Sequence, residues 1–287
     1  MHTLGSVLLF GLLLGGVYAT MAYGLGLIYG VMRIVNLAHG AVLMLAAYAA
    51  YALNARWGLD PFLTLPLVVP AAYVAGVALY VGLVRHVASG PPMASLLLLF
   101  GVSLCARNLA YLVWTGDDRS LTLPHSLATI ALGVPVPLTK LLVFAVALAA
   151  TAGLWATFRF THFGRSIRAV AQDPLAAELT ALSVDRVSAR AFGLGTAMGA
   201  LGGVLLSSLY VINPEFGGGF LLKSFCIIVL GGMDSMVGIF AGALLLGVAE
   251  TAAGVYGAAA LQDAVSFILL VAILVVRPGG LPSLFRS

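Results

Sequence analysis

The sequence predicts an all-α protein built as a polytopic bundle of transmembrane helices. Of its 287 residues, 62% are hydrophobic and only 8% are charged, and the mean hydropathy is +1.10. Soluble domains carry about a quarter charged residues. This composition therefore excludes an ordinary soluble enzyme or a nucleic-acid-binding module. The formal net charge of +4 is better explained by orientation in a membrane than by a nucleic-acid partner.

Long intervals without charged residues mark the helices, because an ionised side chain inside the bilayer is costly unless it is paired. One span needs about 20 mostly apolar residues. These intervals predict nine spans, with eight as the alternative. The spans are expected near residues 6–29, 36–54, 63–84, 94–114, 139–158, 190–212, 220–232, 237–256 and 262–276. Residues 120–139 contain Pro124, Pro135 and Pro137 and are typical of an extracytoplasmic loop or a short re-entrant segment.

The distribution of arginines predicts an N-terminus outside the cell and a C-terminus in the cytoplasm. In this orientation only Arg56 and Arg119 fall clearly outside, which agrees with the bias of basic residues toward the cytoplasm. No basic residue precedes Arg33, so we expect the first apolar stretch to be a retained helix and not a signal peptide. Residues 1–287 are expected to form a single transmembrane domain.

Glycines recur four residues apart in several predicted helices. Examples are Gly11 with Gly15, and the series Gly195, Gly199 and Gly203. This spacing places small residues on one helix face and allows the backbones of neighbouring helices to approach closely. We therefore expect a compact bundle.

Residues 159–190 form the one long polar segment, with eight charged residues in 32. Asp173 followed by Pro174 predicts the start of a short helix, with Glu178 near its positive end. The apolar residues Leu175, Leu179 and Leu182 share one face of that helix.

A short amphipathic helix on the cytoplasmic side has two interpretations. It either lies on lipid headgroups or inserts into a groove on a cytoplasmic partner. The mixture of acidic and basic residues favours the second interpretation slightly, because a helix that binds only lipid would carry uniform basic charge.

Four motifs give the chain a family likeness. They are VNLAHGAVLMLAAY at 35–48, GRSIRAVAQDPLAAELTALSVDR at 164–186, KSFCIIVLGGMDSMVGIFAGALLLGVAE at 223–250 and VVRPGGL at 275–281. In this order they resemble the LivH-type permease of branched-chain amino acid ABC importers. The resemblance implies a multi-pass permease of the bacterial inner membrane that moves branched-chain or related small amino acids into the cytoplasm by alternating access. It also implies a LivM-like second permease, two cytoplasmic ATPases and a periplasmic substrate-binding protein as partners.

In that family the polar loop is the segment that couples the permease to the ATPase. The resemblance therefore assigns an ATPase-coupling role to residues 159–190, with Gly164, Arg165, Arg168, Asp173, Pro174, Glu178 and Leu179 as its candidate residues. The sequence has no phosphate-binding GxxxxGK[ST] loop and no catalytic triad, so we expect a transport subunit that is not itself an enzyme. The alternatives are a permease for urea or short-chain amides, and an ATP-independent channel or carrier.

A small set of polar residues in or near the apolar spans forms the candidate substrate path. Asn36 and His39, followed by Gly40, either line the path or are structural, with Asn36 as a helix cap and His39 bonded to a neighbouring helix. Glu250 either forms a structural ion pair with Lys223 or meets the ammonium group of an amino acid in transit.

Three further expectations concern single positions. Arg107 lies inside a predicted span and is expected to face a partner subunit, the path or an interface. Asp234 and Ser235 are expected to cap a helix at a tight turn. Cys105 and Cys226 are expected to be packing residues, and no residues have the spacing of a metal site. We expect no cofactor.

Overall fold

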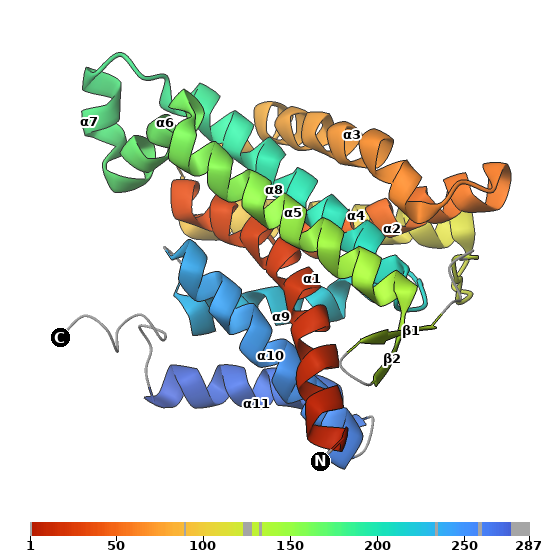
Figure 1. Cartoon of the computed structure of the whole chain (residues 1–287). Coiled ribbons are helices and arrows are strands. Elements are labelled where there is room, and N and C mark those ends of the chain that lie inside the picture. Colours follow the sequence, from red (N-terminus) through yellow and green to blue (C-terminus); the bar gives the residue numbers. More distant parts are fainter. Residues whose placement is uncertain are drawn as a thin grey trace.

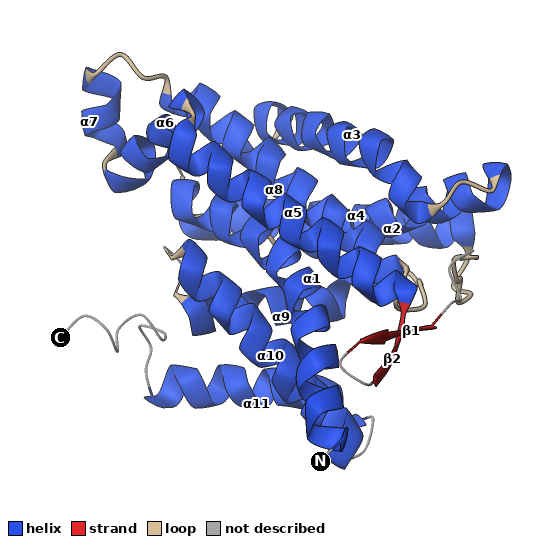
Figure 2. Cartoon of the chain, in the orientation of Figure 1, coloured by secondary structure: helices blue, strands red, loops and turns tan. Residues whose placement is uncertain are grey.

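The computed structural model describes residues 2–88, 90–122, 128–131, 134–232, 235–257 and 260–276. Within these ranges the chain is almost entirely helical (Figure 2), which confirms the all-α prediction. The α-helices are α1 (His2–Met32), α2 (His39–Trp57), α3 (Pro61–Gly82), α4 (Pro92–Trp114), α5 (Leu138–Phe160), α6 (His162–Gln172), α7 (Pro174–Leu179), α8 (Val184–Ser207), α9 (Phe216–Gly231), α10 (Met236–Tyr256) and α11 (Ala260–Val276). A 3₁₀ turn, η1 (Val84–His86), follows α3.

The described part of the predicted loop 120–139 contains a small antiparallel hairpin and no re-entrant helix. Strands β1 (Ala128–Ala131) and β2 (Val134–Pro137) pair so that Thr129 lies opposite Val136. Pro135 and Pro137 have no backbone N–H to donate, which a two-stranded hairpin tolerates because each strand has an unpaired edge.

Six of the described helices are long and apolar enough to cross a membrane. They are α1, α3 with η1, α4, α5, α8 and α10. The helices α2, α9 and α11 have 19, 16 and 17 residues and pack within the same bundle. The chain is therefore a multi-pass membrane protein.

Helix α1 occupies the centre of the bundle (Figure 1). It packs most extensively on α10 and α8, and it also contacts α5 and α9. Its middle segment is completely enclosed, so that Val17, Tyr18, Met21 and Ala22 have no exposed surface.

Glycines allow the helices around α1 to pack with backbones in contact, as their spacing predicts. A Cβ on Gly195 would collide with the Gly24 carbonyl of α1, and one on Gly203 would collide with the backbone of Leu43 in α2. Helices α2 and α9 also approach very closely, and a Cβ on Gly217 would overlap the carbonyl of Gly40. The fold depends on the absence of a side chain at these positions.

The bundle has two distinct ends, and Figure 1 shows the hairpin at one and helices α6 and α7 at the other. At the hairpin end, the Asn54 side chain accepts from the Thr122 backbone N–H (3.1 Å) and donates to the Thr122 carbonyl (3.2 Å). An isolated bridge between Arg119 and Ile212 joins the connections that follow α4 and α8. These bonds tie the loops of that end to one another.

Candidate functional site

Helix α6 folds back against the end of α5 and is anchored there. The Thr161 side chain caps it by accepting from the Gly164 N–H at 3.1 Å. Its apolar residues Ile167 and Val170 are buried in a cluster that includes Leu27 and Val31 of α1. The Arg168 guanidinium donates to the Phe158 carbonyl of α5.

Gly164 is required for this reversal of direction. A Cβ at Gly164 would lie 2.5 Å from the Phe158 Cα and would also overlap the Phe158 and Thr157 carbonyls. Arg165, next in the chain, is exposed and lies 2.8 Å from Nδ1 of His162. The sequence therefore places a glycine where the chain turns and basic residues around it.

Helix α7 begins where the sequence predicts. Asp173 caps it by accepting from the Ala176 N–H at 3.0 Å, and Pro174 occupies the first helical position. The helix ends in a Schellman motif, with the Leu182 N–H bonded to the Ala177 carbonyl and the Ala181 N–H bonded to the Glu178 carbonyl. Six residues are thus held as a helix by a defined cap at each end.

The predicted apolar face of α7 is divided between solvent and core. Leu182 packs against the cluster that buries Ala177, but the side chains of Leu175 and Leu179 are 70% and 84% exposed. Glu178 is exposed beside them. A six-residue helix with two bare leucines at the end of the bundle presents a small apolar surface to a partner or to lipid.

The structure separates Asn36 from the helix that carries His39 and Gly40. Asn36 is buried in the connection before α2, where its side-chain Oδ1 accepts from the Ala38 N–H at 3.0 Å. His39, the first residue of α2, is fully buried, and its Nε2 lies 2.9 Å from the Met21 carbonyl. Gly40 contacts Gly217, as described above. His39 and Gly40 thus fix α2 to α1 and α9, whereas Asn36 orders the turn before α2.

Glu250 lies at the centre of a buried polar network that joins four helices. One carboxylate oxygen accepts from the Tyr18 hydroxyl (2.7 Å) and from the Lys223 ammonium (3.1 Å), and the other accepts from Ser266. Glu250 is only 2% exposed. The network contains the ion pair that was one of the two interpretations of Glu250, and it adds Tyr18 of α1 and Ser266 of α11. Both are polar residues in apolar segments, which is the signal that could have identified them.

Arg107 contacts neither Glu250 nor the coupling segment. Its guanidinium bonds the Glu215 carboxylate at 3.0 Å, and Glu215 also accepts from the Tyr111 hydroxyl at 3.2 Å. This pair is partly exposed and connects α4 to the residue before α9.

Ser235 caps α10 by accepting from the Gly238 N–H at 3.0 Å, whereas Asp234 lies outside the described residues.

Two cavities open between the helices. The larger, of about 570 Å³, lies beside α6 and is lined by apolar residues of α1, α5 and α10 together with Arg33, Arg168 and Gln172. The smaller, of about 310 Å³, lies near the hairpin end between α1, α5, α10 and α11. Asn36, His39, Gly40 and Glu250 line neither cavity. No group of three His, Cys, Asp or Glu side chains within the described ranges could hold a metal ion.

The bundle of apolar helices, with glycine-mediated packing and a capped helical segment at one end, defines a polytopic membrane protein. The chain belongs to the family described as "Branched-chain amino acid transport system / permease component", which it matches over residues 7–274. This match and the ordered motifs of the sequence confirm the expected LivH-type resemblance.

Named relatives agree with the family match. The high-affinity branched-chain amino acid transport system permease protein LivH of Salmonella typhimurium is 32% identical, over 94% of this chain and 92% of the relative. The corresponding permease protein BraD of Pseudomonas aeruginosa is 33% identical, over 94% of this chain and 93% of the relative. The ribose import permease protein RbsC of Bacillus subtilis is 29% identical over only 51% of this chain and 46% of the relative. No solved structure gives a significant match to the chain.

Proposed function

We propose that the protein is the permease subunit of an ATP-driven importer that carries branched-chain or related small amino acids into the cytoplasm of a bacterium. The family match over residues 7–274 carries this proposal. The names of its relatives LivH and BraD supply the substrate class. The working complex contains a LivM-like second permease, two cytoplasmic ATPases and a periplasmic binding protein, and it resides in the inner membrane.

In this proposal the chain crosses the membrane nine times, with its N-terminus outside and its C-terminus in the cytoplasm. The six long apolar helices are joined by α2, α9 and α11, each of which packs along longer members of the bundle. The basic residues around α6 support the placement of that end in the cytoplasm.

The coupling segment, residues 159–190, receives motion from an ATPase through α7. Exposed Leu175 and Leu179 form the docking surface, which fits into a groove on the partner. Because α6 is anchored to α1, α5 and α8, a displacement of α7 is transmitted to three helices of the bundle. Alternating access requires that these helices have two packed arrangements, one open to each side of the membrane.

Asn36, His39, Gly40 and Glu250 act in this scheme as bracing residues. Each makes its contact within the bundle and none lines a cavity described above. Specificity then resides mainly in the binding protein and in weaker contacts along the path.

Uptake by proteoliposomes tests the proposal. The permease is reconstituted with its second permease, ATPases and binding protein, and uptake of labelled leucine, urea and a short-chain amide is measured with ATP inside the vesicles. We expect leucine uptake that requires ATP and stops when a hydrolysis-deficient ATPase is substituted. Equal uptake without the ATPases would show an ATP-independent carrier, and a preference for urea or the amide would reassign the substrate.

A further inference from the structure

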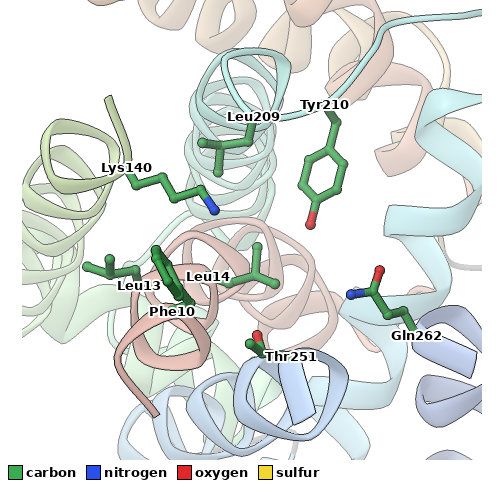
Figure 3. Close-up of a pocket in the computed structure, with 8 residues that line it drawn as sticks. All are labelled: Phe10, Leu13, Leu14, Lys140, Leu209, Tyr210, Thr251 and Gln262. Atoms are coloured by element: carbon green, nitrogen blue, oxygen red, sulfur yellow. The ribbon is translucent and has the colours of Figure 1, made fainter. Parts of the chain in front are cut away.

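The smaller cavity combines four polar side chains with an apolar floor. Its lining consists of Phe10, Leu13, Leu14, Lys140, Leu209, Tyr210, Thr251 and Gln262. Figure 3 shows the ends of Lys140, Tyr210, Thr251 and Gln262 pointing toward one common space, with Phe10 and the two leucines of α1 below. Its volume of about 310 Å³ is at the lower end of the range of about 300–1,000 Å³ that is usual for small-molecule sites.

The position of the cavity places it at the hairpin end of the bundle. Lys140 is the third residue of α5, directly after β2, and Gln262 is the third residue of α11. Tyr210 lies in the turn that follows α8. The site is therefore opposite to the coupling segment, and in the proposed orientation it faces the outside.

Lys140 gives this site its charge. Its ammonium lies over the Phe10 ring, 4.6 Å from the ring centroid. None of the described carboxylates forms an ion pair with it, and the lining residues that the structure describes include no acidic one. A half-buried ammonium over an aromatic ring, at the rim of an open cavity, is available to a carboxylate from outside the chain.

The remaining polar groups suit an ammonium, and the floor suits an apolar side chain. The Tyr210 and Thr251 hydroxyls and the Gln262 carbonyl can all accept hydrogen bonds. Thr251 donates its own proton to the Gly247 carbonyl (2.8 Å), which leaves its oxygen as an acceptor. The described acceptors are all neutral, so they bind an ammonium more weakly than a carboxylate would, which favours release.

We propose that this cavity is an outer binding site of the permease for an α-amino acid with an apolar side chain, in which Lys140 receives the carboxylate. The inference rests on the proposed function and adds to it a location and a recognition residue. The cavity also contacts the buried network around Glu250, because the lining residue Tyr210 interacts with Tyr18, which bonds Glu250. A solute bound in the cavity would therefore be separated from this network by the Tyr210 side chain alone.

Cysteine protection tests the site directly. Thr251→Cys is made in a background with Cys105→Ser and Cys226→Ala, and the membrane complex is assembled without binding protein in phosphatidylcholine vesicles. A membrane-impermeant thiol reagent is added outside, with increasing leucine or with isoamylamine, which has the same side chain but no carboxylate. We expect leucine to slow labelling and isoamylamine to have no effect.

Matched variants separate recognition from folding. Lys140→Met keeps the length of the side chain and should weaken leucine protection about tenfold or more, because a hydrogen bond to a charged group is lost. Lys140→Arg should retain protection. Leu209→Cys, on a different element of the rim, repeats the measurement if Thr251→Cys does not assemble.

The outcomes are distinct. Absence of labelling, labelling that leucine does not slow, or equal protection by isoamylamine would each overturn the site. Protection by phosphatidylglycerol vesicles without leucine would reassign Lys140 to a lipid phosphate and also overturn it. When binding protein is added to vesicles that hold the wild-type complex, ATP-dependent leucine uptake reports the proposed function independently, so a failure of the site is not confused with a failure of the importer assignment.

Discussion

Ala181 adopts a backbone conformation that glycine prefers. Its φ of 62° lies in the left-handed region, at the position of the Schellman motif where glycine is usual. An L-residue pays about 1–2 kcal/mol for this conformation. The cap still forms because two backbone hydrogen bonds and the packing of Leu182 against Ala177 favour it.

Ala181→Gly is therefore expected to stabilise the end of α7. The gain should be at most about 1 kcal/mol, because glycine also loses more backbone entropy on folding. Hydrogen exchange at the amides of residues 181 and 182 measures it, and slower exchange in the variant is the expected result. Faster exchange would mean that the left-handed conformation of Ala181 is not what limits the stability of the cap.

Glu250 illustrates how much of a site the sequence can predict. A single carboxylate in an apolar span and a lysine in the preceding one predicted an ion pair or a substrate contact. The geometry contains the ion pair and adds two hydroxyl donors, Tyr18 from the distant α1 and Ser266 from the next helix, α11. Those partners follow from tertiary packing, which no local pattern encodes.

Glu250→Gln should destabilise the bundle by about 3–5 kcal/mol, because it breaks a buried ion pair with the Lys223 ammonium. Lys223→Met combined with Glu250→Gln should recover most of the loss, since the amide can still bond Tyr18 and Ser266. Thermal unfolding in detergent compares the three proteins. Wild-type stability of the double variant together with abolished leucine uptake would contradict a bracing role and indicate contact with the solute.

At the scale of elements, helix starts were the most predictable feature. Asp173 with Pro174 predicted the first turn of α7, and the structure places the cap there. The burial of its apolar face was less predictable. Periodicity shows that the leucines share a face, but it does not show whether protein or solvent covers that face. The hairpin at 128–137 was missed for a related reason: prolines indicate a loop without specifying how its halves pair.

Two adjacent glycines in α9 test the predicted close approach of helices. Gly217→Ala should destabilise the protein by about 1–3 kcal/mol, because its Cβ would overlap the Gly40 carbonyl. Gly218→Ala has no atom within 4 Å of the added carbon, so it should be neutral or slightly stabilising, in line with the better helix propensity of alanine. Equal unfolding midpoints for the two variants would show that α2 and α9 do not meet through their backbones.

Leu179→Asp should abolish co-purification of the ATPases while leaving the permease as stable as the wild type. The side chain is 84% exposed, so the substitution removes apolar docking surface without opening the core. Leu179→Met keeps an apolar side chain and serves as the matched control. Normal retention of the ATPases by Leu179→Asp would contradict the docking role of α7.

Arg168→Glu should also release the ATPases, but by another route. It replaces the donor to the Phe158 carbonyl and detaches α6 from α5. A lower unfolding midpoint is therefore expected in addition to lost co-purification. An unchanged midpoint would show that the anchor of α6 lies elsewhere.

For the whole molecule, sequence composition predicted a multi-pass bundle and the placement of charges predicted its orientation. Cysteine labelling tests that orientation in a Cys105→Ser background. Leu175→Cys on α7 should react only when the reagent reaches the cytoplasm, and Gly116→Cys, after α4, should react from outside. Both positions are exposed. Reaction of the two cysteines from the same side would contradict the proposed topology.

The central place of α1 has a consequence for how the protein is made. Helix α1 is made before α8 and α10, which begin only at Val184 and Met236, yet it packs most extensively on these two helices. The acceptor of its Tyr18 hydroxyl is synthesised 232 residues later. During translation α1 must therefore be sheltered by lipid or by the insertion machinery, and its final environment assembles only after α8 and α10 have been synthesised.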